Sequence, residues 1–231
     1  MLSIIIPAYN EERRIGKTLR DFIGFFDRKG LTYELIIVMD GCTDRTPDIV
    51  RGFAEKKRNI RFVISNERQG KGGALLKGFA VARGDFVAYT DADGSTPPGE
   101  ILSLLKRIGD CDGIIGSRWM KGSCVAAKQT LMRRIASRGF NVLVRLVFGL
   151  DYKDTQCPAK LFKGKVVRDV ADKLEVTNFA IDACILYVIK RMGYRVKEVP
   201  IRWVDKPMST LKIGRAVPNM FFTVIKLRLK G

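Results

Sequence analysis

Two carboxylates separated by a single residue, Asp91 and Asp93, directly follow a run of apolar, β-branched and aromatic residues, Phe86–Thr90. Such a run predicts a short buried strand. Because alternate residues of a strand point the same way, a strand that continued here would bring the two carboxylates together. They repel each other unless a cation lies between them, and oxygen ligands suit Mg²⁺ or Mn²⁺. Two solvated turn aspartates would give the same pattern, so the pair alone does not establish a metal site.

The residue types of the chain narrow the chemistry that is available. It has no histidine among its 231 residues, which excludes histidine acid–base catalysis and histidine-ligated metals. Its five cysteines are scattered without a C-x-x-C pair, so they suggest neither a zinc site nor a disulfide framework, and reduced thiols in a cytosol are the simplest account. Any catalysis must therefore rest on carboxylates, cationic side chains and bound metal.

Positive charge is concentrated in the second half of the chain. Residues 1–115 carry a net charge of +2, whereas residues 116–231 carry +16 of the total of +18. This asymmetry predicts an anionic partner that meets only the second half: nucleic acid, anionic lipid headgroups or a phosphorylated substrate. A nucleic-acid-binding module is disfavoured, because the basic half has no recognised binding motif and no interleaved aromatic residues for base stacking.

The elements that must position these groups alternate between strand and helix along the first half. Apolar runs and helical periodicity predict strands at 2–7, 33–39, 60–64, 85–90 and around 114–115, and helices between 10 and 30, over 46–57 and over 70–82. This alternation is typical of an α/β fold with a mostly parallel central sheet and helices on both faces. Ligands of such sheets bind at the carboxyl ends of the strands, which here are rich in acids, polar groups and glycine.

Four blocks at these strand ends, in this order and spacing, resemble the family 2 glycosyltransferases of the GT-A fold. The blocks are Ile4–Glu12, Ile37–Asp44, Asn66–Gly73 and Asp91–Gly94, and together they span the first half of the chain. The resemblance implies a Rossmann-like GT-A fold, a nucleotide-sugar donor and a metal-dependent hexosyltransferase.

The resemblance also implies roles for individual residues. The nucleotide sugar would be bound by nine of them: Pro7, Ala8, Tyr9, Glu11, Asp40, Gly70, Lys71, Asp91 and Ala92. Asp91 and Asp93 would hold the diphosphate through Mg²⁺ or Mn²⁺. The residue chemistry agrees, because a carboxylate such as Asp40 can accept hydrogen bonds from ribose hydroxyls or a base N–H. Glycines at 70, 72 and 73 let a backbone approach closely, and a helix N-terminus there favours an anion.

Further blocks in the second half are similar to the polyprenyl-phosphate branch of that family, especially its dolichyl-phosphate glucosyltransferases. They are Asp154–Cys157, Lys160–Phe162, Phe179–Asp182, Glu198–Asp205 and Ser209–Lys212. This similarity implies transfer of a hexose, with glucose from UDP-glucose favoured, to a polyprenyl or dolichyl phosphate. A mannose synthase that uses GDP-mannose is the alternative, because the choice of donor rests on Asp154–Cys157.

A phosphate acceptor lessens the need for a general base, because a lipid phosphate is already ionised at neutral pH. The resemblance places three residues near that phosphate, to which two lysines are added as further candidates: Arg118, Arg133 and Ser137, then Lys206 and Lys212. It also implies an acid near the sugar at Asp182. The expected catalytic residues are thus Asp91, Asp93, Arg118 and Asp182. In-line attack by a phosphate oxygen would invert the anomeric carbon.

The last stretch of the chain, residues 216–231, is apolar with late basic residues, and Pro218 is placed to begin a helix there. It is too short and too basic to span a bilayer, so two arrangements stay open: an interfacial helix on anionic lipid, or a helix docked on the core. Without a transmembrane span or signal peptide in the sequence, we expect a cytoplasmic protein, peripheral on the cytoplasmic face of the membrane. We expect a GT-A domain over 1–215, with a nucleotide-sugar-binding half, 1–115, and an acceptor-binding half, 116–215, followed by an amphipathic tail.

Overall fold

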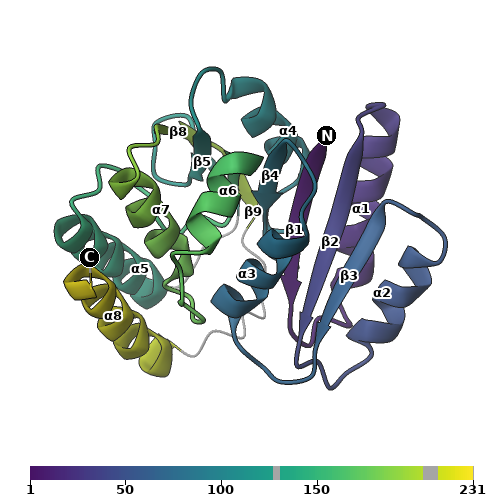
Figure 1. The fold of residues 1–231 in the computed structure, drawn as a ribbon, viewed down its shortest axis with the longest axis horizontal. Coiled ribbons are helices and arrows are strands. Elements are labelled where there is room, and N and C mark those ends of the chain that lie inside the picture. The colour runs from purple at the N-terminus through teal and green to yellow at the C-terminus, as the bar shows by residue number, and fades with distance from the viewer. Residues whose placement is uncertain (127–130, 205–212, 231) are drawn as a thin grey trace.

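The computed structural model of the protein describes residues 1–126, 131–204 and 213–230, leaving aside the side chains of residues 131–136 and 213–217 and of Lys230. Its centre is a seven-stranded sheet in the order β3-β2-β1-β4-β7-β5-β8 (Figure 1). The strands of this sheet are β1 (Leu2–Ala8), β2 (Tyr33–Asp40), β3 (Ile60–Ser65), β4 (Phe86–Tyr89), β5 (Gly113–Ser117), β7 (Lys160–Lys163) and β8 (Val196–Pro200). Neighbouring strands are parallel except at β7, which runs antiparallel to both β4 and β5. The expected α/β fold with a mostly parallel sheet is confirmed.

Helices cover both faces of the sheet, as Figure 1 shows. The helices are α1 (Ile15–Arg28), α2 (Thr46–Ala54), α3 (Lys71–Val81), α4 (Pro98–Arg107), α5 (Leu131–Phe148), α6 (Gly164–Ala171), α7 (Ile181–Arg191) and α8 (Ile213–Lys230). The alternation of side chains along β1 shows how two cores arise. Ile4 and Ile6 face the core that α1, α2 and α4 complete, whereas Ile5 faces the core of α3 and α5 to α8.

Strand β7 was not predicted, although its residues lie in one of the blocks that carried the resemblance. It has four residues, in which two apolar side chains are flanked by lysines, and this is too short for a periodic signal. It comes from the second half of the chain and pairs with β4 and β5 of the first half. The donor-binding and acceptor-binding halves that we expected therefore share one sheet.

Two other boundaries differ from the prediction. Strand β4 ends at Tyr89, so Asp91 and Asp93 lie in the turn that follows it and not in a continuing strand. Helix α8 begins at Ile213, so that Pro218 lies inside the helix and does not begin it. Met220 and Val224 bury α8 against the core, while Phe222 and Leu229 remain exposed. The packing of α8 therefore agrees with the alternative of a core-docked helix, and contact of its exposed apolar side with lipid stays a prediction.

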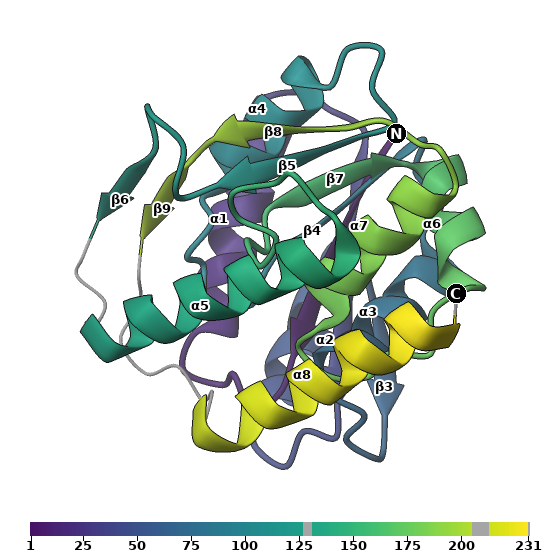
Figure 2. The same ribbon diagram turned by 90° about the vertical axis from the view of Figure 1, so that its left-hand side faces the viewer.

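A second, two-stranded sheet pairs β6 (Cys124–Ala126) with β9 (Arg202–Val204) beside the main sheet. Figure 2 shows α5 and α8 lying side by side on the face that is turned toward the viewer. Among the helices that the structure describes, none has the length and apolar character to cross a membrane.

Candidate active site

Loops that follow β1, β2, β3 and β4 converge on a cavity of about 130 Å³ at the carboxyl edge of the sheet. This donor cavity contains all nine residues that we expected to bind the nucleotide sugar, together with Asp93. Four further residues of its lining were not among the predicted binding residues: Arg14, Arg68, Ala74 and Phe179. The convergence follows from the rule that parallel strands present their carboxyl ends at one edge.

Lys71, the first residue of α3, joins Asp91 to a second and deeper carboxylate. Its Nζ lies 3.0 Å from Oδ1 of Asp91 and 2.9 Å from Oδ2 of Asp182. Burial alone would lower the pKa of Lys71, but the carboxylates of Asp182 and Asp91 outweigh burial and hold this pKa above its ordinary value. Lys71 is therefore a firmly charged ammonium that bridges two acids.

Asp182 lies in the first turn of α7, beneath Lys71 and outside the lining of the donor cavity. Its Oδ1 accepts a hydrogen bond from the Tyr89 hydroxyl at 2.9 Å and lies 3.0 Å from Nζ of the fully buried Lys160. Burial raises the pKa of Asp182, yet Lys160 and Lys71 together leave this pKa lowered. The expected position of Asp182 beside the sugar stays a prediction; in the structure Asp182 is connected to the cavity through Lys71.

Two carboxylates of the cavity, Glu11 and Asp91, have raised pKa values although each contacts a cation. Burial raises the pKa of Glu11 despite a bidentate pair with Arg14, whose Nε and Nη2 lie 2.6 Å from it, and Asp93 and Asp91 raise this pKa further. Burial also raises the pKa of Asp91, which Lys71 partly offsets and Asp93 reinforces. Such a cluster favours an added cation.

The carboxylates of the cavity suit a hard divalent cation, but they are too few to surround one. Within the described ranges of the chain, no group of three or more His, Cys, Asp or Glu is arranged to hold a metal. Asp91 and Asp93 can supply two carboxylates, while Oδ1 of Asp93 also accepts the N–H of Ser95 at 2.8 Å. Further oxygens would have to come from water or from a bound diphosphate, as Mg²⁺ in particular requires.

Asp40 is buried at the end of β2, and its carboxylate organises the loop before α3. Its two oxygens accept the backbone N–H groups of Gln69 at 2.8 Å and Gly70 at 2.7 Å. Gly70 has a φ of +89°, a conformation that favours glycine, and it forms the N-cap of α3. Asp40 therefore shapes the cavity wall as well as lining it.

The N-terminus of α3 is occupied by protein. The carbonyl oxygen of Thr177 accepts the N–H groups of Gly72 at 2.7 Å and Gly73 at 3.4 Å. A Cβ atom on Gly72 would lie 2.1 Å from the carbonyl oxygen of Val176, so only glycine permits this approach. Our expectation of close backbone approach is confirmed, but the partner is the segment before α7. The expectation of an anion is wrong for these two donors, because Thr177 already uses them.

Arg68, which was not among the residues expected to bind the donor, stacks on the expected Tyr9 in the wall of the cavity. The guanidinium carbon of Arg68 lies 3.7 Å from the centroid of the Tyr9 ring, within the range of a cation–π contact. Arg68 belongs to the Asn66–Gly73 block, but nothing in the spacing pairs it with Tyr9. The flat stack is a suitable wall for a planar base.

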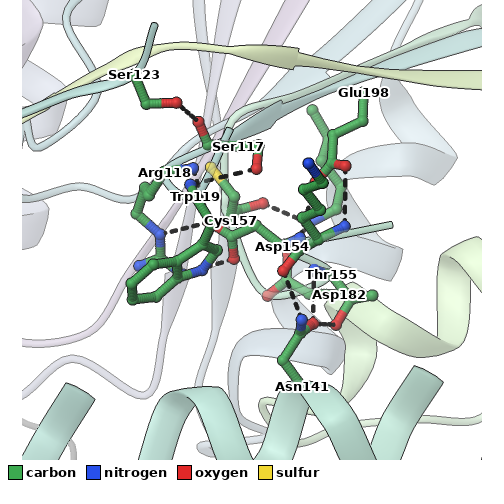
Figure 3. A network of polar contacts seen from close by, with 12 residues as sticks. Ser117, Arg118, Trp119, Ser123, Asn141, Asp154, Thr155, Cys157, Asp182 and Glu198 are labelled. Atoms are coloured by element: carbon green, nitrogen blue, oxygen red, sulfur yellow. Dashed lines mark hydrogen bonds and ion pairs between the residues drawn. The ribbon is translucent and has the colours of Figure 1, made fainter. Parts of the chain in front are cut away.

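The second half contains a different ion pair, between Arg118 after β5 and Asp154 (Figure 3). Nε and Nη2 of Arg118 donate to Asp154 at 2.7 and 2.8 Å, and the backbone N–H of Arg118 donates at 3.0 Å. The guanidinium also lies 5.2 Å from the ring of Trp203 and 5.8 Å from that of Trp119. Arg118 was expected to meet the acceptor phosphate, but these contacts commit much of its guanidinium to Asp154.

The loop around Asp154 is tied to two further elements (Figure 3). Glu198 of β8 accepts the N–H groups of Lys153 at 2.9 Å and Asp154 at 2.7 Å. Oδ1 of Asn141 on α5 accepts the hydroxyl of Thr155 at 2.6 Å and its N–H at 3.0 Å. The Asp154–Cys157 block thus fixes α5, the most arginine-rich helix of the chain, to the sheet.

Other residues expected at the acceptor lie on or near α5. Ser137 is half-buried, and the guanidinium carbon of the neighbouring Arg138 lies 4.7 Å from the ring of Trp119. The backbone of Arg133 belongs to α5, but its side chain lies outside the described residues. Lys206 and Lys212 lie outside them entirely.

The sequence profile of the family described as Glycosyl transferase family 2 matches residues 3–171, well over half of the chain. The chain belongs to glycosyl transferase family 2. The expected family is therefore confirmed, and the donor cavity lies within the matched region except for Phe179.

Family 2 relatives extend the similarity to nearly the whole chain. A "Dolichyl-phosphate beta-glucosyltransferase" of Dictyostelium discoideum is 32% identical over 99% of this chain and 74% of its own length. One of Drosophila melanogaster is 35% identical over 91% of this chain and 69% of its own length. "Glycosyltransferase AglD" of Haloferax volcanii is 33% identical over 97% of this chain, which spans only 36% of that protein.

Solved structures agree with the family 2 fold. Glucosyl-3-phosphoglycerate synthase from Mycobacterium tuberculosis, in complex with Mn²⁺, UDP and glucosyl-3-phosphoglycerate, has a TM-score of 0.73. That similarity covers 100% of this chain and 79% of the other, at 17% identity. At this identity the comparison bears on the fold alone, and it confirms the GT-A-like arrangement.

Proposed function

We propose that this chain transfers glucose from UDP-glucose to a polyprenyl phosphate of the dolichyl type, with inversion at the anomeric carbon. One observation carries the proposal: the donor cavity gathers every residue expected for a nucleotide sugar, on a chain whose relatives named dolichyl-phosphate beta-glucosyltransferase match it almost throughout. Transfer of mannose from GDP-mannose is the second candidate, because the same cavity accounts for either nucleotide.

On the donor side, the stack of Arg68 on Tyr9 would face the base, and Glu11 is placed for the ribose or its neighbours. Asp91 and Asp93 would hold Mg²⁺ or Mn²⁺ together with diphosphate oxygens. A bound metal of this kind supplies Lewis acidity to the departing diphosphate. Lys71 lies in the same wall and offers a further positive charge to that diphosphate.

On the acceptor side, the reaction needs an ionised phosphate and a positive surface to receive it. A phosphate oxygen forms the new bond to the anomeric carbon while the bond from that carbon to the diphosphate breaks, and the electron pair leaves with UDP. No proton has to be removed from the acceptor, which agrees with a chain that has no histidine. Arg133, Ser137, Lys206 and Lys212 stay predicted contacts of the acceptor phosphate.

Helices α5 and α8 supply a surface that suits a lipid acceptor. Arg138, Val142 and Leu146 succeed one another at four-residue spacing on α5, which places them on one side of that helix. Phe222 and Lys226 do the same on α8, and all five of these side chains are exposed. Apolar side chains mixed with cations on two adjacent helices are typical of helices that lie on anionic membranes. We therefore propose that the chain lies peripherally on a membrane, with the cytoplasmic face as the side expected from the sequence.

A transfer assay tests the reaction. The purified protein is incubated with polyprenyl phosphate, MnCl₂ and radiolabelled UDP-glucose or GDP-mannose, and the label in the organic phase is counted. We expect label from UDP-glucose, a β-linked product by NMR, and a loss of roughly a hundredfold or more in Asp91→Asn. Label from GDP-mannose alone would move the proposal to the second candidate. Label from neither donor, or an α-linked product, would contradict it.

The membrane contact is tested separately by sedimentation with vesicles of phosphatidylcholine and phosphatidylglycerol. The double substitution Leu146→Glu and Phe222→Glu should abolish co-sedimentation and transfer to long-chain acceptor in vesicles. Transfer to a short, water-soluble prenyl phosphate should survive. Phe62→Glu, at an exposed apolar residue of the edge strand β3, is the matched control and should sediment as the unsubstituted protein does. Equal sedimentation of the two variants would contradict this surface.

A further inference from the structure

The bridge made by Lys71 is unequal at its two ends. The Asp182 end is closed, because the Asp182 side chain is 2% exposed and is also held by Lys160 and Tyr89. The Asp91 end is open, because the Asp91 side chain is 36% exposed and lines the donor cavity. Water or a ligand can therefore replace the contact with Asp91 without disturbing the contact with Asp182.

The charges of the Lys71 bridge itself balance, and Asp93 beside it adds one further negative charge. Lys71 and Lys160 contribute two positive charges, and Asp91 and Asp182 two negative ones. A divalent cation on Asp91 would add two positive charges within a few ångströms of the Lys71 ammonium, in a partly buried site where repulsion is strong. A diphosphate that arrives with the cation removes this excess.

We propose that Lys71 is a resident counter-cation of Asp91 that yields this carboxylate to the metal only when the nucleotide diphosphate arrives. Released from Asp91 and still held by Asp182, the ammonium then turns to a diphosphate oxygen. Metal and nucleotide consequently bind as one unit, and metal alone binds weakly. Asp182, Lys160 and Tyr89 are positioning residues in this scheme, because they act on the donor through Lys71. The inference rests on the proposed use of a nucleotide diphosphate.

We call this exchange, in which Lys71 releases Asp91 to the metal, the handover. It is tested by measuring Mn²⁺ binding directly, from the electron paramagnetic resonance signal of free Mn²⁺. In the unsubstituted protein, UDP should tighten Mn²⁺ binding by about tenfold or more. In Lys71→Met, Mn²⁺ alone should bind about tenfold more tightly than to the unsubstituted protein, and UDP should tighten this binding by a smaller factor than it does in the unsubstituted protein. Lys71→Arg keeps the charge and should keep the weak binding of Mn²⁺ alone.

Lys77→Met is the matched control, because Lys77 lies on the same helix but donates to Oγ of Ser65 at 2.7 Å. It should leave Mn²⁺ binding unchanged. Lys71→Gln serves in place of Lys71→Met if thermal unfolding shows that the latter does not fold. Tight binding of Mn²⁺ alone to the unsubstituted protein, or unchanged binding in the uncharged Lys71 variant, would overturn the handover.

The experiment separates this inference from the proposed function when GDP is tested beside UDP. Binding of neither nucleotide by the unsubstituted protein would reject the proposed donor chemistry. If the protein binds a nucleotide but its affinity for Mn²⁺ is the same with and without the charge at position 71, the proposed role of Lys71 is rejected and the proposed donor chemistry is not. Binding of GDP in place of UDP would change the donor and leave the handover to be judged with GDP.

Discussion

The ion pair of Lys71 with Asp91 and the ion pair of Arg118 with Asp154 hold their cations in different ways. Lys71 makes one contact to each of two carboxylates, one of which lies on an open cavity. Arg118 presents a fork to a single buried carboxylate, which its own backbone N–H also meets. A point charge shared in this way can change partners, whereas a fork cannot do so without losing several bonds at once. The donor side thus contains an exchangeable charge, and the acceptor side a fixed one.

The fixed pair should show the largest effect on stability. Asp154→Ala leaves the guanidinium of Arg118 buried without its partner, and we expect it to lower the free energy of unfolding by about 3–5 kcal/mol. Urea denaturation followed by circular dichroism measures this loss. The double substitution Arg118→Met and Asp154→Leu should recover most of it, because no charge is then left buried. A double variant no more stable than Asp154→Ala would show that Arg118 does more than balance Asp154.

Replacing Asp182, the buried partner of Lys71, should lower the free energy of unfolding by a smaller amount. This loss should depend on pH. Asp182→Asn should cost about 2 kcal/mol at pH 7, since Lys71 keeps Asp91 and Lys160 keeps the carbonyl oxygen of Cys157 as a partner. The amide oxygen that replaces the carboxylate can still accept hydrogen bonds at this position. The pKa of Asp182 is lowered in the folded protein, so its contribution is fully present above its ordinary pKa of 3.8 and is lost as the pH falls through the folded value. Urea denaturation of both proteins between pH 7 and pH 3 should show the difference shrinking only below about pH 4. A difference that stays constant over this range would contradict the assignment.

The smallest effect is expected at the link between the fixed pair and α5. Thr155→Val removes the hydroxyl that donates to Asn141 but keeps the backbone N–H bond to the same oxygen. We expect a loss of about 1 kcal/mol in the free energy of unfolding, again from urea denaturation. Transfer to the lipid acceptor should fall more than UDP binding does, because α5 and not the donor cavity loses its support. A larger effect on UDP binding would show that the two sides are coupled through this loop.

The sequence suffices to bring together the residues of the donor cavity but not the partners in the buried polar contacts, for a physical reason. Residues such as Glu11 and Asp91 follow their strands directly, so that strand prediction and the rule for parallel sheets suffice to bring them together. Arg118 and Asp154 are 36 residues apart, and Tyr89 and Asp182 are 93 apart. Over such sequence separations, tertiary packing decides which charged side chains form a pair. The periodicity of the sequence does not reveal that packing.

The same limit explains why β7 was missed, although the alternation of the first half was predicted. Parallel strands that are connected by helices have strong local signals. A four-residue antiparallel strand takes its identity from the two neighbours that it joins, β4 and β5. The resemblance included Lys160–Phe162 in one of its blocks but gave no structural role for them. The structure supplies that role, because these residues pair with both β4 and β5.

The place of β7 in the sheet also bears on how the protein is made. Strand β4 ends at Tyr89 and β7 ends at Lys163, so the ribosome adds the intervening segment before β7 can cover the free edge of β4. At ordinary rates of synthesis this takes roughly 4–15 s. For that time the nascent chain carries β4 as an open edge that is able to pair with other strands, and a chaperone that shields this edge would act at one definable interval of translation.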